Sequence, residues 1–236
     1  MYARCPQQYE FKYIKKTQVP PLPLDLRMFC GTAVHSTLEM AYKNFLEKNE
    51  KPPLNTLHAH TLTLWEQAQK DSPISISPEE LQSFMEKSKK NVEWFYAHLF
   101  SKETEATIGV EKKLMYPLAP QKKEWLIAFL DRVSQPSDYH IVVHDYKTGQ
   151  LNLNDKSIHS DFQASLYGAM AAHEFAPLSI IELRWHFLSH EKTVRAQLNP
   201  ESARGAIEKA RFIATKIRHA KDENAKSFYE HFGFES

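Results

Sequence analysis

Three strand-like segments in the middle of the chain most constrain its fold. Residues 108–118, 124–134 and 139–147 are rich in β-branched and aromatic side chains, and short polar turns separate them. Connections this short join neighbouring antiparallel strands, so the three segments predict a meander. Two further segments, at 180–188 and 193–198, have the same character and predict two more strands.

Segments with helical periodicity surround these strands. Apolar residues recur at intervals of three and four along several of them, which predicts helices at 32–48, 56–70, 77–100, 160–175 and 200–219. The third helix has a clear start: Ser77 as N-cap, Pro78 at the first helical position, and acidic residues in the first turn. The order of elements predicts an α/β protein of the α+β type, with a mixed central sheet flanked by helices.

We expect one domain over residues 1–236. In it, residues 1–106 form a mainly helical portion, 107–219 a sheet core and 220–236 a tail. A length of 236 residues is enough to bury a full core, and no apolar run approaches the roughly 18 residues of a membrane span. The polar N-terminus does not resemble a signal peptide, so we expect an intracellular protein that does not bind membranes.

Charge and cysteine content exclude several classes of protein. The net charge is only +1, so binding to a nucleic acid would have to depend on local basic clusters. Such clusters occur at Lys12/Lys15/Lys16, Lys87/Lys89/Lys90, Lys112/Lys113/Lys122/Lys123 and Lys209/Arg211/Lys216/Arg218. They are either solvated faces or, if they line one groove, a binding surface. Two cysteines, Cys5 and Cys30, cannot supply four thiolates for a zinc or iron–sulfur site.

Residues 131–147 carry the polar groups that suggest chemistry. Asp145 and Lys147 are two apart on a predicted strand, so their side chains share one face. Asp131 lies towards the end of the preceding strand, and a hairpin would bring it beside Asp145. Because neighbouring carboxylates repel, a cation between them is favourable, and oxygen ligands favour Mg²⁺ or Mn²⁺. The alternative is an ordinary hairpin with charges on its surface.

Five segments occur in an order and spacing that resemble a known family. They read LDRV and HDYKTG at 130–133 and 144–149, GTAVHSTLE at 31–39, QASLY at 163–167, and CPQQYEFKY at 5–13. Together they are similar to the PD-(D/E)xK nuclease superfamily, in its RecB-type, CRISPR-adaptation-like exonuclease branch. The resemblance implies a restriction-endonuclease-like core with a helical N-terminal portion. The C-terminal cysteines of the iron–sulfur subgroup are absent, so we expect no cluster; the aromatic residues of the tail would pack in its place.

The resemblance also implies roles for single residues. Asp131 and Asp145 would bind the metal, helped by the backbone carbonyl of Tyr146. His35, on the first predicted helix, would complete the metal site, although a lone histidine on a helix is more often structural. Lys147 would be the catalytic lysine.

Three further residues have two interpretations each. Glu111 resembles the acidic residue that this branch carries on its first strand, and the alternative is a charge on an edge strand. Gln163 and Tyr167 are four apart and so lie on one helix face. They would hold substrate phosphate or orient Lys147, and the alternative is packing between the helix and the sheet.

The sequence therefore predicts a Mg²⁺- or Mn²⁺-dependent DNA nuclease that hydrolyses phosphodiester bonds, an exonuclease of DNA repair or recombination. Its DNA substrate would be single-stranded or a duplex end. The chain has no helicase motifs, so unwinding would come from a helicase or repair complex as partner. Two alternatives remain: a non-catalytic DNA-binding protein of the same fold, and an interaction subunit whose hairpin is merely structural.

Overall fold

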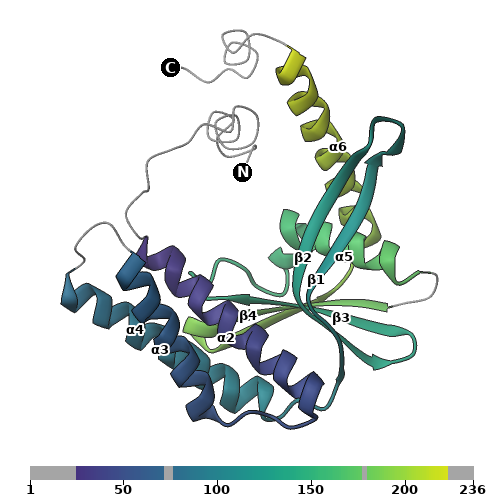
Figure 1. Cartoon of the computed structure of the whole chain (residues 1–236). Coiled ribbons are helices and arrows are strands. Elements are labelled where there is room, and N and C mark those ends of the chain that lie inside the picture. The colour runs from purple at the N-terminus through teal and green to yellow at the C-terminus, as the bar shows by residue number, and fades with distance from the viewer. Residues whose placement is uncertain (1–24, 72–76, 177–179, 223–236) are drawn as a thin grey trace.

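The computed structural model describes residues 25–71, 77–176 and 180–222 of the chain (Figure 1). The predicted signature at 5–13, with Cys5, lies outside these residues, as do the aromatic residues of the tail. The assignment of a single domain with its three portions stays a prediction.

The predicted helices are present, with somewhat different bounds. They are α2 (Leu26–Lys48), α3 (Leu54–Asp71), α4 (Pro78–Phe95), α5 (Phe162–Glu174) and α6 (Pro200–Asp222), and a π-helical turn, Tyr96–Phe100, extends α4. Helix α2 begins earlier than predicted because Asp25 caps it, accepting hydrogen bonds from the backbone N–H groups of Arg27 and Met28. Ser77 caps α4 as expected.

Five strands form one mixed sheet, as predicted. They are β1 (Ala106–Ala119), β2 (Glu124–Ser137), β3 (His140–Lys147), β4 (Ile180–Phe187) and β5 (Lys192–Gln197), and they lie side by side in this order. Neighbours are antiparallel except β3 and β4, which are parallel and joined through α5. One expectation was wrong: β2 continues to Ser137, so Asp131 lies inside the strand rather than towards its end.

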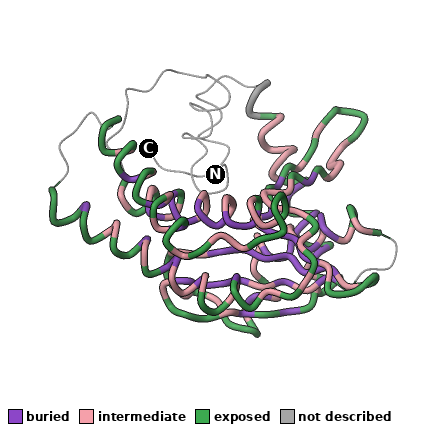
Figure 2. Tube along the Cα trace, turned by 60° about the horizontal axis from the view of Figure 1, so that its bottom comes forward, coloured by how far each residue is buried: buried purple, intermediate pink, exposed green. Residues whose placement is uncertain are grey.

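Helices cover both faces of the sheet, which makes three layers. On one face, Tyr146 of β3 packs among buried side chains of α2 and α4, including Leu38 and Phe95. On the other face, Val143 packs against residues of α5 such as Met170. Figure 2 shows the buried stretches of the chain gathered between these layers, with exposed stretches at the periphery. None of the described helices is long and apolar enough to cross a bilayer.

Candidate active site

The carboxylate of Asp131 joins β2 to β3 where their ladder ends. The pairing runs up to Arg132 and His144, so Asp131 lies at the next position. Its Oδ2 accepts a hydrogen bond of 2.7 Å from the backbone N–H of Tyr146. The hairpin therefore brings Asp131 next to Asp145, as the sequence predicts.

Helix α2 brings His35 to this carboxylate. The Nδ1 atom of His35 lies 3.3 Å from Oδ1 of Asp131. A Cβ atom on Gly31, one turn earlier, would lie 3.2 Å from Oγ1 of Thr148, so this glycine lets α2 approach the segment after β3. Burial would lower the pKa of His35, but the hydrogen bond and charge of Asp131 outweigh it and raise that pKa.

Glu111 reaches the same place because β1 is irregular there. Its φ of 46° is in the left-handed region, and the register of β1 against β2 shifts between Thr107 and Gly109. Ligand atoms of His35, Glu111 and Asp131 all lie within 4.8 Å of one another. Burial, followed by the charge of Asp131, raises the pKa of Glu111. The structure thus places Glu111, on the edge strand β1, beside two of the predicted metal ligands, His35 and Asp131.

A small cavity of about 10 Å³ lies among these groups, about the size of one water molecule. Its lining residues are His35, Leu38, Glu39, Tyr42, Glu111, Asp131 and Tyr146. Glu39 ends the segment 31–39 that resembles the family, but no role was predicted for it, although it follows His35 by four residues and so lies on the same helix face. In the structure Glu39 forms an ion pair of 2.5 Å with Lys43.

Asp145 and Lys147 share one face of β3, as predicted, and this face meets α5. Nζ of Lys147 lies 2.6 Å from Oδ2 of Asp145 and donates a hydrogen bond of 3.1 Å to Oε1 of Gln163. Nε2 of Gln163 in turn donates to Oδ1 of Asp145 at 3.3 Å. Burial and the charge of Asp131 raise the pKa of Asp145 to about 7, even though Lys147 opposes them.

Tyr167, the other predicted residue of α5, lies one turn after Gln163. Its ring centroid is 6.1 Å from that of Trp185, within the core on this side of the sheet. Burial, followed by the charge of Asp145, raises the pKa of the Tyr167 phenol to about 12. The ring therefore serves the packing of helix on sheet, while the phenol stays within the electrostatic field of the site.

The predicted residues thus form two neighbouring groups. His35, Glu111 and Asp131 are brought together by α2, β1 and β2. The second group, Asp145, Lys147 and Gln163, is turned towards α5, and Asp145 is not among the clustered ligand atoms. Alternation along β3 explains the separation, because Tyr146 faces α2 while its neighbours face the opposite side.

A buried arginine follows Asp131 in β2. Arg132 forms an ion pair with Glu103, and its guanidinium lies 4.6 Å from the ring centroid of Tyr42. The side chain of Arg132 is only 1% exposed. No role was predicted for Arg132 from the sequence, although an arginine inside a strand that is otherwise buried must have a partner.

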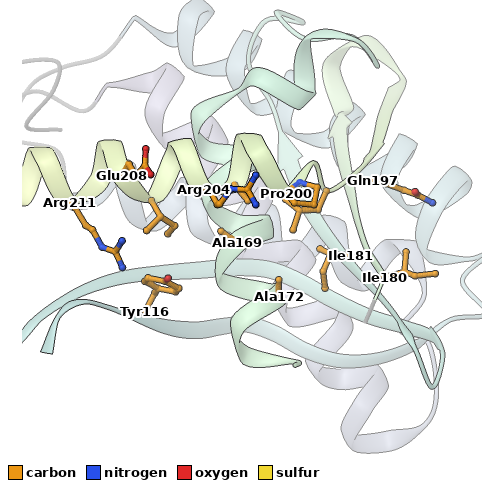
Figure 3. A pocket seen from close by; sticks show the side chains of 13 residues that line it. Tyr116, Ala169, Ala172, Ile180, Ile181, Gln197, Pro200, Arg204, Glu208 and Arg211 are labelled. Carbon is orange, nitrogen blue, oxygen red and sulfur yellow. The ribbon is translucent and has the colours of Figure 1, made fainter. Parts of the chain in front are cut away.

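A larger cavity lies elsewhere, between α6, α5 and the sheet (Figure 3). It measures about 590 Å³, and Tyr116, Ile181, Leu198 and Ile207 line it together with Arg204 and Arg211. None of the predicted site residues lines this cavity, and its walls are mainly apolar. We therefore assign the chemistry to the clustered carboxylates.

Comparisons with known proteins identify the family of the chain. No curated protein matches the chain. A family model described as PD-(D/E)XK nuclease superfamily matches residues 1–231, which is nearly the whole chain. The mixed five-stranded sheet with helices on both faces is consistent with the restriction-endonuclease-like fold of that superfamily. On this match and this fold, the chain belongs to the PD-(D/E)XK nuclease superfamily.

Proposed function

We propose that this protein is a Mg²⁺- or Mn²⁺-dependent deoxyribonuclease, an exonuclease of the RecB-type branch that acts in DNA repair or recombination inside the cell. Membership of a nuclease superfamily supports hydrolysis of phosphodiester bonds. The observation that carries the proposal is the meeting of His35, Glu111 and Asp131 beside Asp145 and Lys147. A helicase or a repair complex would supply single strands or duplex ends.

The residues present fit a hard divalent cation. Two carboxylates and an imidazole gather within 4.8 Å of one another. Such a set, rich in oxygen, suits Mg²⁺ or Mn²⁺. Asp145, the next carboxylate along, is buried, and its Oδ2 forms an ion pair with Lys147. When bound, the ion would polarise a phosphate oxygen and acidify a water molecule.

The protein's own groups would position the substrate and stabilise charge. The Lys147 side chain is 31% exposed, so its ammonium can turn from Asp145 towards a phosphate in solution. There it would stabilise the negative charge that develops during hydrolysis. Gln163, hydrogen-bonded to both Lys147 and Asp145, would hold the ammonium in place. Asp131 would keep His35 oriented towards the ligand cluster.

Cleavage of end-labelled DNA tests the proposal. Wild-type protein should degrade single-stranded or duplex DNA in Mg²⁺ or Mn²⁺ and leave it intact in EDTA. Asp145→Ala and Lys147→Ala should abolish cleavage while the circular dichroism spectrum stays unchanged. Full activity in either purified variant would refute the mechanism. Binding of DNA without cleavage in any metal would instead favour the non-catalytic alternative.

Circular single-stranded DNA separates exonuclease from endonuclease activity. An exonuclease needs a free end, so the linear strand should be degraded and the circle of the same sequence should survive. Cleavage of the circle at a comparable rate would refute the exonuclease assignment, while it would leave the hydrolytic function in place.

A further inference from the structure

A long hairpin of β1 and β2 extends from the sheet beyond the active site (Figure 1). We call residues 112–130 the arm. As far as Pro117 its strands pair in regular register, with Lys113 opposite Phe129, Met115 opposite Ile127, and Pro117 opposite Trp125; the register shifts between Pro117 and Ala119. Opposed residues of an antiparallel pair point to the same side, so these side chains share one face of the arm.

This face of the arm is apolar and exposed. The residues Met115, Trp125, Ile127 and Phe129 are 42%, 47%, 48% and 53% exposed. The alternate residues on the other face, such as Leu114 and Leu130, are buried. Exposed apolar patches on an edge hairpin favour aggregation, so a face of this kind usually has a binding role.

Helices hold the arm from behind and leave this face free of described residues. Glu124 forms an ion pair of 2.8 Å with Arg218 of α6, and Lys112 forms one of 3.4 Å with Glu174 of α5. The ring of Tyr116 meets Arg211 of α6 on this same back side (Figure 3). The aromatic residues of the front face therefore stand on a fixed support, which reduces the entropy lost when a ligand binds.

The exposed face continues directly into the active site. Phe129 precedes Asp131 by two residues on the same strand, and Lys113 follows Glu111 by two. Two strand residues span roughly 7 Å, and Trp125 is roughly 20 Å from Asp131 by the same measure. A ligand lying along this face would therefore reach the carboxylates with its end.

Positive charge borders the apolar face. Lys113 lies on it, and Lys122 and Lys123 lie at the tip of the arm. All three are exposed, and they form no ion pair with a carboxylate among the described residues. The only acidic residue of the arm, Glu124, is already paired with Arg218. The free charge along this face is thus positive and suits a polyanion.

We propose that this face of the arm binds single-stranded nucleic acid by stacking bases on Trp125 and Phe129, and leads the strand to the active site. The inference rests on the proposed nuclease function and names its substrate class. Unpaired bases offer free ring faces for aromatic side chains, whereas the bases of a duplex are already stacked on one another. The lysines would contact phosphates, and the apolar side chains would contact bases.

Fluorescence anisotropy in EDTA measures this binding without cleavage. At 3.4 Å per stacked base, 20 Å holds about six bases, so a labelled oligothymidine of about 12 nucleotides is long enough. An abasic strand of equal length has the same phosphates without the bases. Wild-type protein should bind the oligothymidine more tightly than the abasic strand. Trp125→Ala and Phe129→Ala should each weaken oligothymidine binding by roughly 5- to 150-fold and leave abasic binding nearly unchanged.

Two further variants serve as controls. Trp125→Phe keeps an aromatic ring and should retain most of the affinity. Tyr139→Ala removes an aromatic side chain that is 62% exposed, in the turn between β2 and β3, and it should bind as wild type does.

Four results would overturn the inference. The first two are a wild type that fails to bind oligothymidine at low salt, and arm variants that lose equal affinity for the oligothymidine and the abasic strand. The other two are a wild-type dimer that Trp125→Ala converts to monomer, and a fall of more than about 6 °C in the Tm of an arm variant. The last would show that another part of the chain covers the face, because exposed substitutions have small effects on stability.

The nuclease function is tested separately, by cleavage in Mg²⁺. If the wild type cleaves DNA but the arm variants bind oligothymidine as tightly as the wild type, the binding face is refuted and the nuclease function stands. Stacking-dependent binding with no cleavage in any metal would overturn the nuclease function while supporting the binding face.

Discussion

Replacing Asp145 with asparagine should make the metal-free protein more stable while it abolishes activity. Asp145 is buried, and desolvation together with the charge of Asp131 raises its pKa from 3.8 to about 7. Holding such a group ionised above pH 7 costs about 4 kcal/mol relative to the unfolded chain. Asparagine has nearly the same shape and no charge, but it gives Lys147 no counter-charge. We therefore expect a net gain of about 2 kcal/mol at pH 8.

The gain should depend on pH with a definite sign. A carboxyl group whose folded pKa is raised binds its proton more tightly in the folded state. Because of Asp145, the stability of the wild type in EDTA therefore falls as the pH rises from about 4 to about 7, and this loss stays constant above pH 7. At pH 4 the wild-type group is largely protonated when folded, so Asp145→Asn should there resemble the wild type.

Thermal unfolding in EDTA measures the effect. A gain of about 2 kcal/mol corresponds to a rise in Tm of about 4–8 °C for a chain of this length. The matched control is Asp138→Asn, an exposed aspartate in the turn after β2, which should change Tm by less than about 2 °C. Mg²⁺ should raise the Tm of the wild type and not that of Asp145→Asn. Equal shifts at pH 4 and pH 8, or a loss of stability at pH 8, would refute the reasoning.

Three other variants or conditions test the support of the site. Arg132→Met should lower the free energy of unfolding by about 3–5 kcal/mol in urea titrations, because it leaves Glu103 without its buried partner. Burial lowers the pKa of His186 to about 3. As the pH falls below about 6.5, this histidine therefore binds a proton in the unfolded chain but not in the folded one. His186 by itself should then lower the stability by about 2 kcal/mol at pH 5, and burial also lowers the pKa of its neighbour His144, which adds to the fall. The fall is best measured in Asp145→Asn, where the opposite effect of Asp145 is absent. Gly31→Leu should displace α2 and weaken Mg²⁺ binding by calorimetry, whereas a side chain on exposed Gly205 meets no neighbour and should leave binding unchanged.

Regular periodicity explains what the sequence predicted well. The strands from 106 to 147 follow from their composition and short turns, and the common face of Asp145 and Lys147 follows from a period of two. The helical period places Gly31 and His35 on one face of α2. These patterns are local, so tertiary contacts change the ends of the elements more than their existence.

Other features depend on contacts between distant segments. Glu111 points to Asp131 only because its backbone takes a φ of 46° in an irregular stretch of β1, which no spacing rule indicates. The turn of Asp145 towards Gln163 depends on how α5 docks on the sheet. The exposure of Trp125 and Phe129 could not be foreseen either, because a strand with apolar residues on both sides is ordinarily buried on both faces.

Several departures from ordinary folding rules lie close together where β1, β2 and β3 adjoin. Glu111 has a left-handed backbone, the carboxylate of Asp145 is buried, and Asp131 adds a second carboxylate beside it. Each lowers stability, and a substitution as small as Asp145→Asn would remove part of that loss. Local strain beside a cluster of carboxylates is expected where function opposes stability. A divalent cation relieves the repulsion of the carboxylates, and so the same residues that destabilise the free protein are those that would hold the metal.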